Sequence, residues 1–448
     1  MKRILLSGTM LLAGMSAMNA VEPVKDPATY APAGDTHFQS LWMYSPKTEN
    51  AHPMMNTGNT RGICCVNDKV YLPLRGAEFH QINEFDANTG AFLKTYTLPI
   101  TVNGNTPGLH LNDLQSDSQG NLAGCNIATD IQKGMFYVWK MKKGAYDAPE
   151  ELLAWTWGDQ GQAALRIDYF DVYGDVYGDG YILASVAGAI EGYSNIVFKW
   201  DIVNGVASTE PTPIQAQGYI PAKITTNGSA PRVRALSPDN FYLDPSNAHP
   251  SLYDMEGQLV EGFDITKVST KSSGPNGVDE FTLGDRTFLV AGTNNHGVLE
   301  GYAKNIAEVF EITGGMNEAT SLQIFPKNGL GDNTNSGQTV EPAVRVVDEN
   351  TADIFVHAYG NGVAAYRCSL KPLSIDKEKM SAMNIHLAGS ELVFSEEAAK
   401  VDVYAVAGNC VAQYANVNRA NLSLVKGIYI VKAMDMAGKT KVQKIVVE

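Results

Sequence analysis

The sequence predicts an all-β protein, namely a β-propeller of about six four-stranded blades followed by a small C-terminal antiparallel β-sandwich. Two observations predict the propeller. A strand-like motif recurs at a nearly constant interval, and a spare strand pattern near the N-terminus matches a gap in the last repeat. The composition agrees, because 42 glycines and an excess of tyrosine over phenylalanine, 20 to 15, are typical of turn-rich β proteins.

The recurring motif is an aromatic residue followed directly by a charged one, within a short run of alternating apolar and polar residues. The aromatics are 54 to 59 residues apart, an interval that suits a four-stranded blade. We expect them to be core residues that pack one blade against the next. The six pairs are Phe85-Asp86, Trp139-Lys140, Phe198-Lys199, Tyr253-Asp254, Phe310-Glu311 and Tyr366-Arg367.

Turn residues divide each repeat into strands. The first repeat has four predicted strands, over 61–66, 69–74, 82–86 and 92–98. The sixth repeat has strands over 343–347, 353–359 and 363–368 but lacks a fourth. The spare strand over 38–44 would supply it and close the ring, because closure removes the exposed edges of the array. Tandem β-sandwiches and an open array are the alternatives.

The N-terminal segment has the layout of a secretory signal peptide over residues 1–20. Lys2 and Arg3 precede an apolar stretch from Ile4 to about Ala17, and small residues follow. A membrane anchor is the alternative, but the stretch is shorter than the about 20 residues that a spanning helix needs. We therefore expect an exported protein with no transmembrane segment in the mature chain, outside the cell, on its outer surface or in the periplasm. The propeller would occupy 36–373 and the sandwich 384–448.

The charge and the cysteine pattern exclude several classes of function. A formal net charge of -14 disfavours binding to nucleic acids and to anionic membranes. The five cysteines have no CxxC spacing, so zinc is not indicated, and we expect mostly buried thiols, with one disulfide left open. No motif points to a cofactor.

The tail carries a family resemblance. Short strands are predicted over 384–387, 391–394, 400–406, 411–414, 427–433 and 441–447. Val401–Gly408, the hexamer Gly427-Ile-Tyr-Ile-Val-Lys432 and the closing Lys444-Ile-Val-Val447 resemble the C-terminal sorting domain of type IX (Por) secretion cargo. The resemblance covers about the last 65 residues. It implies passage across the outer membrane through the secretion machinery, often with attachment to the cell surface.

One departure from that family leaves an alternative open. The family usually opens the domain with a Tyr-Pro-Asn-Pro-like segment, and residues 380–387 contain none. A degenerate domain kept as a structural module is therefore the alternative. The body of the chain resembles uncharacterised secreted β-propeller proteins that carry a cell-adhesion label.

Motifs for chemistry are sparse. The chain has no GxSxG nucleophile elbow, no HExxH and no P-loop. Asp171, Asp175 and Asp179 recur every four residues, but a turn fits them better than a calcium loop, because Tyr177 stands where an oxygen ligand would be needed. The histidines His296 and His357, in Gly- and Asn-rich surroundings, are expected to be satisfied or solvated.

One set of charged residues does indicate a candidate site. The first strand of a propeller blade lines the central channel, and charged residues stand near the start of that strand in every repeat. Folding would gather them at one face, where carboxylates with arginines could hold a sugar or act as acid and base on a glycosidic bond. A solvated mouth with mutual salt bridges is the alternative. The residues are Arg61, Asp113, Asp168, Arg232, Asp279 with Glu280, and Glu341.

These observations favour an exported, non-catalytic binding or adhesion protein that recognises an extracellular glycan or protein through one propeller face. A glycan-active hydrolase or lyase that uses the channel-mouth carboxylates is one alternative, and a structural surface protein is another. Trp155, Trp157 and Tyr173 are aromatics that could contact a ligand, although burial is the expected position of each.

Overall fold

The computed structural model describes residues 21–447 except 56, 77–79, 100–110, 160, 162, 189–194, 219–229, 246–248, 265, 269–274, 294–302, 334–339, 371–380 and 406–408. The predicted signal peptide over 1–20 and His296 lie outside the described residues. The chain forms two compact units, one up to Pro372 and one from Leu373, and each is described by itself.

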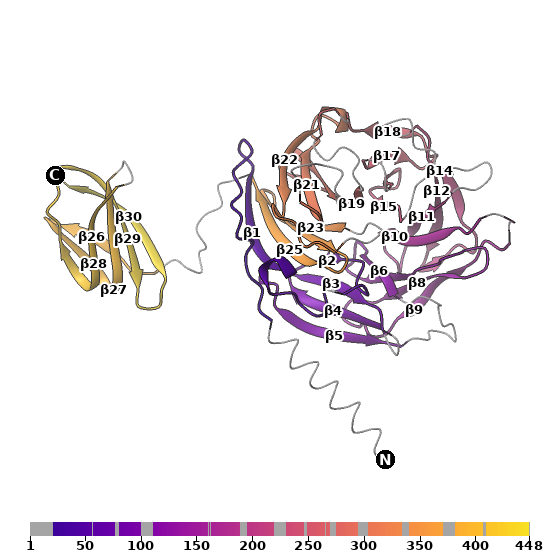
Figure 1. Ribbon diagram of the computed structural model, residues 1–448, viewed down its shortest axis with the longest axis horizontal. Coiled ribbons are helices and arrows are strands. Elements are labelled where there is room, and N and C mark those ends of the chain that lie inside the picture. The colour runs from indigo at the N-terminus through magenta and orange to yellow at the C-terminus, as the bar shows by residue number, and fades with distance from the viewer. Residues whose placement is uncertain are drawn as a thin grey trace, which may run out of the picture. The chain divides into compact units, whose positions relative to one another are not determined.

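The first unit is a ring of six antiparallel sheets, as traced by the described residues (Figure 1). In the first five sheets the strands follow one another outward in chain order, except that the last two strands of the third sheet both pair with its third strand. Blade 1 is formed by β2 (Cys64–Val66), β3 (Lys69–Leu74), β4 (His80–Asp86) and β5 (Phe92–Leu98). Blade 2 is formed by β6 (Leu111–Ser116), β7 (Leu122–Asn126), β8 (Phe136–Met141) and β9 (Glu150–Trp155). Blade 3 is formed by β10 (Arg166–Gly174), β11 (Gly180–Ala187), β12 (Ile196–Val203), β13 (Val206–Ala207) and β14 (Thr212–Gln215).

The remaining blades repeat this plan. Blade 4 is formed by β15 (Arg232–Ala235), β16 (Asn240–Asp244), β17 (Ser251–Asp254) and β18 (Leu259–Gly262). Blade 5 is formed by β19 (Pro275–Leu283), β20 (Arg286–Thr293), β21 (Ile306–Glu311) and β22 (Thr320–Phe325). Blade 6 contains β23 (Val340–Asp348), β24 (Thr351–Ala358) and β25 (Gly362–Ser369). Two short 3-10 helices, η1 (Pro46–Thr48) and η2 (Met316–Glu318), lie between strands.

The N-terminal strand completes the sixth blade. The strand β1 (His37–Tyr44) pairs antiparallel with β25, from His37 opposite Ser369 to Tyr44 opposite Val363. The indole of Trp42 donates a hydrogen bond of 2.8 Å to the carbonyl of Ala87, so this strand also holds the first blade. The predicted closure is confirmed, and tandem sandwiches and an open array are wrong.

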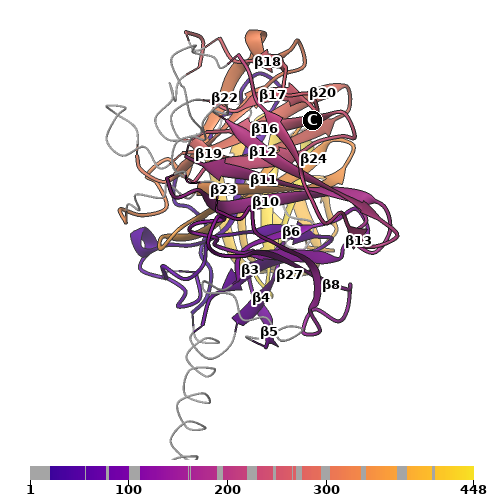
Figure 2. The same cartoon turned by 90° about the vertical axis from the view of Figure 1, so that its right-hand side faces the viewer.

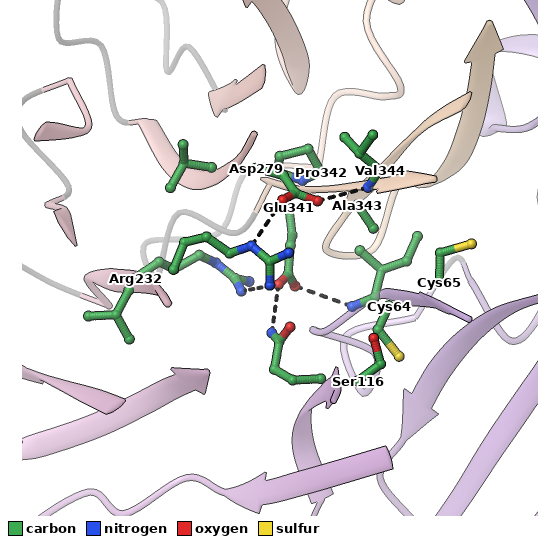
Figure 3. A pocket seen from close by; sticks show the side chains of 14 residues that line it. Cys64, Cys65, Ser116, Arg232, Asp279, Glu341, Pro342, Ala343 and Val344 are labelled. Carbon is green, nitrogen blue, oxygen red and sulfur yellow. Dashed lines mark hydrogen bonds and ion pairs between the residues drawn. The ribbon is translucent and has the colours of Figure 1, made fainter. Parts of the chain in front are cut away.

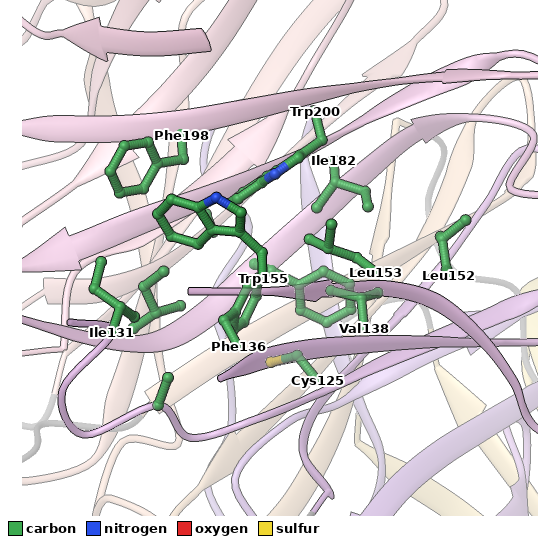
Figure 4. Close-up of a cluster of buried hydrophobic side chains, with 14 of the residues drawn as sticks. Cys125, Ile131, Phe136, Val138, Leu152, Leu153, Trp155, Ile182, Phe198 and Trp200 are labelled. Atoms are coloured by element: carbon green, nitrogen blue, oxygen red, sulfur yellow. The ribbon is translucent and has the colours of Figure 1, made fainter. Parts of the chain in front are cut away.

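The six periodic aromatics occupy equivalent places. Each lies on the third strand of its blade and is at most 5% exposed, in the strands β4, β8, β12, β17, β21 and β25. Figure 4 shows one of the resulting clusters, in which Trp155 packs against Phe198 with ring centroids 5.0 Å apart. Trp157 packs on the same Phe198, and Tyr173 stacks on Tyr181. Trp155 is buried, so it is a packing residue rather than a ligand contact.

The second unit is an antiparallel β structure with its own core. The predicted strands over 391–394 and 400–406 belong to one long strand, which pairs with β28 along one side and with β26 and then β29 along the other. Val401, Val403, Val431 and Ala433 are fully buried in its core. The described strands are β26 (Ile385–Ala388), β27 (Glu391–Ala405), β28 (Cys410–Asn421), β29 (Gly427–Asp435) and β30 (Thr440–Val447).

All five cysteines are free thiols, so the disulfide that the sequence left open is not formed. Among the described residues, no helix has both the length and the hydropathy to cross a bilayer.

Candidate functional site

The predicted site residues lie where the innermost strands begin, a face of the ring that we call the channel mouth. The strand β10 begins with Arg166 and β15 with Arg232, while Glu341 and Asp113 are the second and third residues of β23 and β6. Figure 2 shows the ring from the side, with β6, β10 and β23 crossing its thickness. Residues at matching positions on different blades therefore meet near one level of the axis.

β-Bulges shape this level. In blades 2, 3 and 5 the pairing of the innermost strand with its neighbour shifts register within its first few residues. An extra residue on one strand of a pair rotates the following side chains. In blade 3 the bulge falls at Asp168 and Tyr169, so both of these consecutive residues are buried and both contact arginines of the channel mouth.

Arg232 is the centre of the arrangement and contacts four other blades. Its guanidinium forms an ion pair of 2.7 Å with Glu341 and a longer one of 3.9 Å with Asp113. It also lies over the ring of Tyr169 at 3.5 Å and donates a hydrogen bond to the carbonyl of Arg61. The side chain is buried, and the carboxylates keep its pKa above the ordinary value against the effect of burial.

Asp113 and Glu341 are fully engaged carboxylates. Both lie within 3.3 Å of the same amide nitrogen of Gln115. Asp113 accepts further hydrogen bonds from the backbone N–H of Leu114 and of Phe170, and Glu341 accepts one from Ile63. Burial raises the pKa of both carboxyl groups, and Arg232 opposes the shift.

Asp168 joins two arginines at the mouth. It receives Arg166 through both carboxylate oxygens, with the Nε bond at 2.6 Å, and Arg61 at 3.4 Å. The structure thus brings together Arg61, Asp113, Asp168, Arg232 and Glu341, which we call the mouth network. Its members come from five blades.

Two predicted residues do not belong to the mouth network. Asp279 lies deeper, as the fifth residue of β19, where Arg234 joins it at 2.9 Å and reaches Asp171 at 3.1 Å. Glu280 accepts a hydrogen bond from the hydroxyl of Tyr242, between blades 4 and 5. Neighbours on a strand face opposite sides, so Glu280 turns toward Tyr242, whereas Asp279 lines the same small cavity as Arg232 and Glu341.

A small cavity lies between the two levels of charge (Figure 3). Its volume is about 60 Å³, and its lining includes Arg232, Glu341, Asp279 and Cys65. Pockets for small ligands typically span about 300 to 1,000 Å³, so this cavity can hold a few water molecules and not a sugar ring. A ligand would have to bind above the mouth network, on the channel mouth itself.

Besides Arg166, which begins β10, sequence reasoning missed three side chains there. The guanidinium of Arg61 lies 4.9 Å from the ring centroid of Tyr359, and Arg75 donates a hydrogen bond of 2.9 Å to the carbonyl of Gly58. A Cβ added to Gly58 would fall 2.5 Å from the Tyr359 hydroxyl, so this glycine allows Tyr359 to approach the backbone. Tyr169 is the third. None of the three stands at the start of an inner strand, which was the pattern searched.

The other candidates have structural positions. His357 lies opposite Glu341 on β24 and is fully buried, contrary to the loop position that its neighbours suggested. Asp175 and Asp179 accept backbone N–H groups in turns. In the described part of the chain, no group of three or more histidine, cysteine or acidic side chains is arranged to hold a metal ion.

Comparisons with known proteins do not assign the chain to a family. No protein family matches the chain, and no curated protein matches it. Among solved structures, a thermostable family-43 glycoside hydrolase aligns with 84% of this chain and 99% of its own at 9% identity and a TM-score of 0.36. The dihydro-heme d1 dehydrogenase NirN in complex with DHE aligns with 90% of this chain and 74% of its own at 10% identity and a TM-score of 0.34. Similarities this weak carry no argument about activity.

Proposed function

We propose that this chain is an exported, non-catalytic binding protein that recognises an extracellular glycan or protein through the channel mouth of its propeller. One observation carries the proposal. The carboxylates of the mouth network are all engaged by arginines or backbone N–H groups, and the space beside them is too small for a sugar. A rigid ring whose polar mouth residues already have partners is suited to binding rather than to catalysis.

Export is part of the proposal and rests on the sequence. The signal-peptide layout over 1–20 supports entrance into a secretory route, and the sorting-domain resemblance of the tail supports passage across an outer membrane. Expression of the full chain in a host with type IX secretion, with and without residues 373–448, tests it. Retention of the truncated protein inside the cell, with release or surface display of the full chain, is the expected result.

A glycan-active enzyme is the second candidate, and one observation favours it. The raised pKa of Asp113 and of Glu341 is what a general acid needs, and the two carboxylates are close neighbours around Gln115. Their hydrogen bonds and the small cavity argue against it, because both carboxylates already have partners and the space beside them is too small for a sugar ring.

A glycan array with the chain from Val21 onward, followed by turnover assays on every glycan that binds, separates the candidates. We expect binding without turnover, and we expect Glu341→Gln to leave the absence of turnover unchanged. Release of reducing ends that is abolished by Asp168→Asn or Glu341→Gln would establish the enzyme instead. Binding to a protein fraction alone would keep the proposal and remove its glycan arm.

A further inference from the structure

The side chains around Arg61 and Asp168 of the mouth network are cationic, although the chain is acidic overall. Arg61, Arg75 and Arg166 gather there, and Asp168 is the one carboxylate that the described residues place among them. The formal net charge of the chain is -14. Three arginines around one carboxylate leave two positive charges without a partner inside this group.

Hydrogen-bond donors in this group point to a missing acceptor. Among the described residues, the Nε atoms of Arg61 and Arg75 and the hydroxyl of Tyr169 are buried without a hydrogen-bond partner. Tyr169 is 1% exposed, and burial raises its pKa to about 12, so its hydroxyl keeps its proton at neutral pH. Buried polar groups in native proteins are nearly always paired, so these unpaired donors indicate that an acceptor is missing beside the three arginines.

Arg75 is the clearest of these groups. Arg75 is half-buried, and among the described residues its guanidinium donates a hydrogen bond to the carbonyl of Gly58. Burial and the neighbouring charge of Arg61 lower the pKa of Arg75. An anion between Arg75 and Arg61 would relieve this repulsion, and the planar fork of an arginine matches a carboxylate with two parallel hydrogen bonds.

The surroundings favour a sugar over a peptide. The rings of Tyr359 and Tyr169 stand beside the arginines, and the residues that follow Tyr359, Gly360 and Asn361, line a cavity of about 450 Å³. That volume lies in the range of small-ligand pockets. The exposed large apolar side chains of the described propeller do not include any residue of the arginine group or of this cavity, whereas protein interfaces are anchored by apolar and aromatic residues.

We propose that Arg61, Arg75, Arg166, Tyr169 and Tyr359 form a binding site for an acidic glycan, with the carboxylate of a uronic acid held between Arg75 and Arg61. This inference rests on the proposed function and names its ligand class. Neighbouring sugar units extend toward Gly360 and Asn361.

The test is calorimetric titration of the chain from Val21 onward with three oligomers of equal length: galacturonate, its methyl ester and neutral galactose. We expect the galacturonate oligomer alone to bind, with affinity that falls as salt rises. Arg75→Gln should weaken binding at least tenfold, and Arg166→Gln should weaken it as well. Arg419→Gln is the matched control, because Arg419 is an exposed arginine of the second unit, ion-paired with Glu391.

Four outcomes would contradict different parts of the proposal. Equal binding of the neutral and acidic oligomers overturns the acidic-ligand inference and leaves the proposed function standing. Galacturonate binding that Arg75→Gln and Arg166→Gln leave unchanged, in variants that keep the thermal transition of the parent, overturns this site. Poly-glutamate is titrated as a fourth ligand, and binding equal to that of the galacturonate oligomer would show that any polyanion is bound and would overturn the glycan assignment. Failure of every oligomer, together with a glycan array without hits, contradicts the glycan arm of the proposed function as well.

Discussion

His357 is the buried side chain whose ionisation the fold opposes most clearly. It is fully buried beside Arg232 and opposite Glu341, and among the described residues neither ring nitrogen has a hydrogen-bond partner. Burial lowers its pKa to about 3, against 6.5 for an ordinary histidine. The folded chain therefore keeps the imidazole neutral where the unfolded chain takes up a proton.

The sign of the pH effect follows from this difference. Between pH 6.5 and about 3 the unfolded state binds one more proton at His357, so stability falls as the pH falls, by about 1.4 kcal/mol per pH unit. We expect His357→Gln to remove that slope. Urea unfolding of both proteins between pH 6 and pH 4 measures it, and parallel dependences would contradict the assignment. The raised pKa values of Asp113 and Glu341 act in the opposite direction, but both proteins contain these groups, so they cancel in the comparison.

Among the strands, β1 is the one that closes the ring. It contributes the outer strand of blade 6, and its Trp42 is 2% exposed and bonded to blade 1. Without it, β25 would present an unpaired edge and the ring would stay open between its first and last blades.

A chain that begins at Ser45 should therefore self-associate and lose its cooperative thermal transition. Light scattering and calorimetry are the measurements. The matched comparison is Val260→Ala, which shortens an exposed side chain on the outer strand of blade 4 and should leave stability within about 0.5 kcal/mol of the parent. A monomeric, cooperatively folded truncated chain would show that closure by β1 is dispensable.

The β-bulges in the inner strands β6, β10 and β19 also shape the site. They decide which side chains of the inner strands turn toward the mouth, and they lie at corresponding places in three blades. Strict alternation would have put Asp168 and Tyr169 on opposite faces. The bulge explains why the site contains a tyrosine that the strand pattern did not select.

In the molecule as a whole, the first unit is held across its axis by Arg232 and the second unit has a separate core. Replacing Arg232 by methionine leaves Asp113 and Glu341 buried without their cation, which costs about 3 to 5 kcal/mol. We expect two calorimetric transitions in the parent chain. Arg232→Met should lower the temperature of the larger one and leave the smaller unchanged.

A control sharpens this comparison. The triple variant Arg232→Met, Asp113→Asn, Glu341→Gln removes the stranded charges and should recover much of the loss, because replacing all partners of a buried ion pair costs less than removing one. A single transition that moves as one in both variants would show that the two units unfold together.

The repeat in the sequence was enough to define the propeller. The apolar faces of the blades are covered by neighbouring blades, so the spacing of six aromatics indicates the number of blades, and the missing fourth strand indicates where the chain closes. The same reasoning placed Arg61, Asp113, Asp168, Arg232 and Glu341 near one another, because equivalent strand positions meet at the axis. These features depend on periodicity, which is local and visible along the chain.

The contacts between side chains of different blades could not be predicted from the sequence. The separate level of Asp279, the outward position of Glu280 and the approach of Arg75 and Tyr359 to Arg61 depend on register shifts, strand depth and loop geometry. A shift of one residue reverses which side chain faces the axis, and alternating residues alone do not record it. Residues from five blades form the mouth network only when the ring closes, which is why its pairing could be seen only in three dimensions.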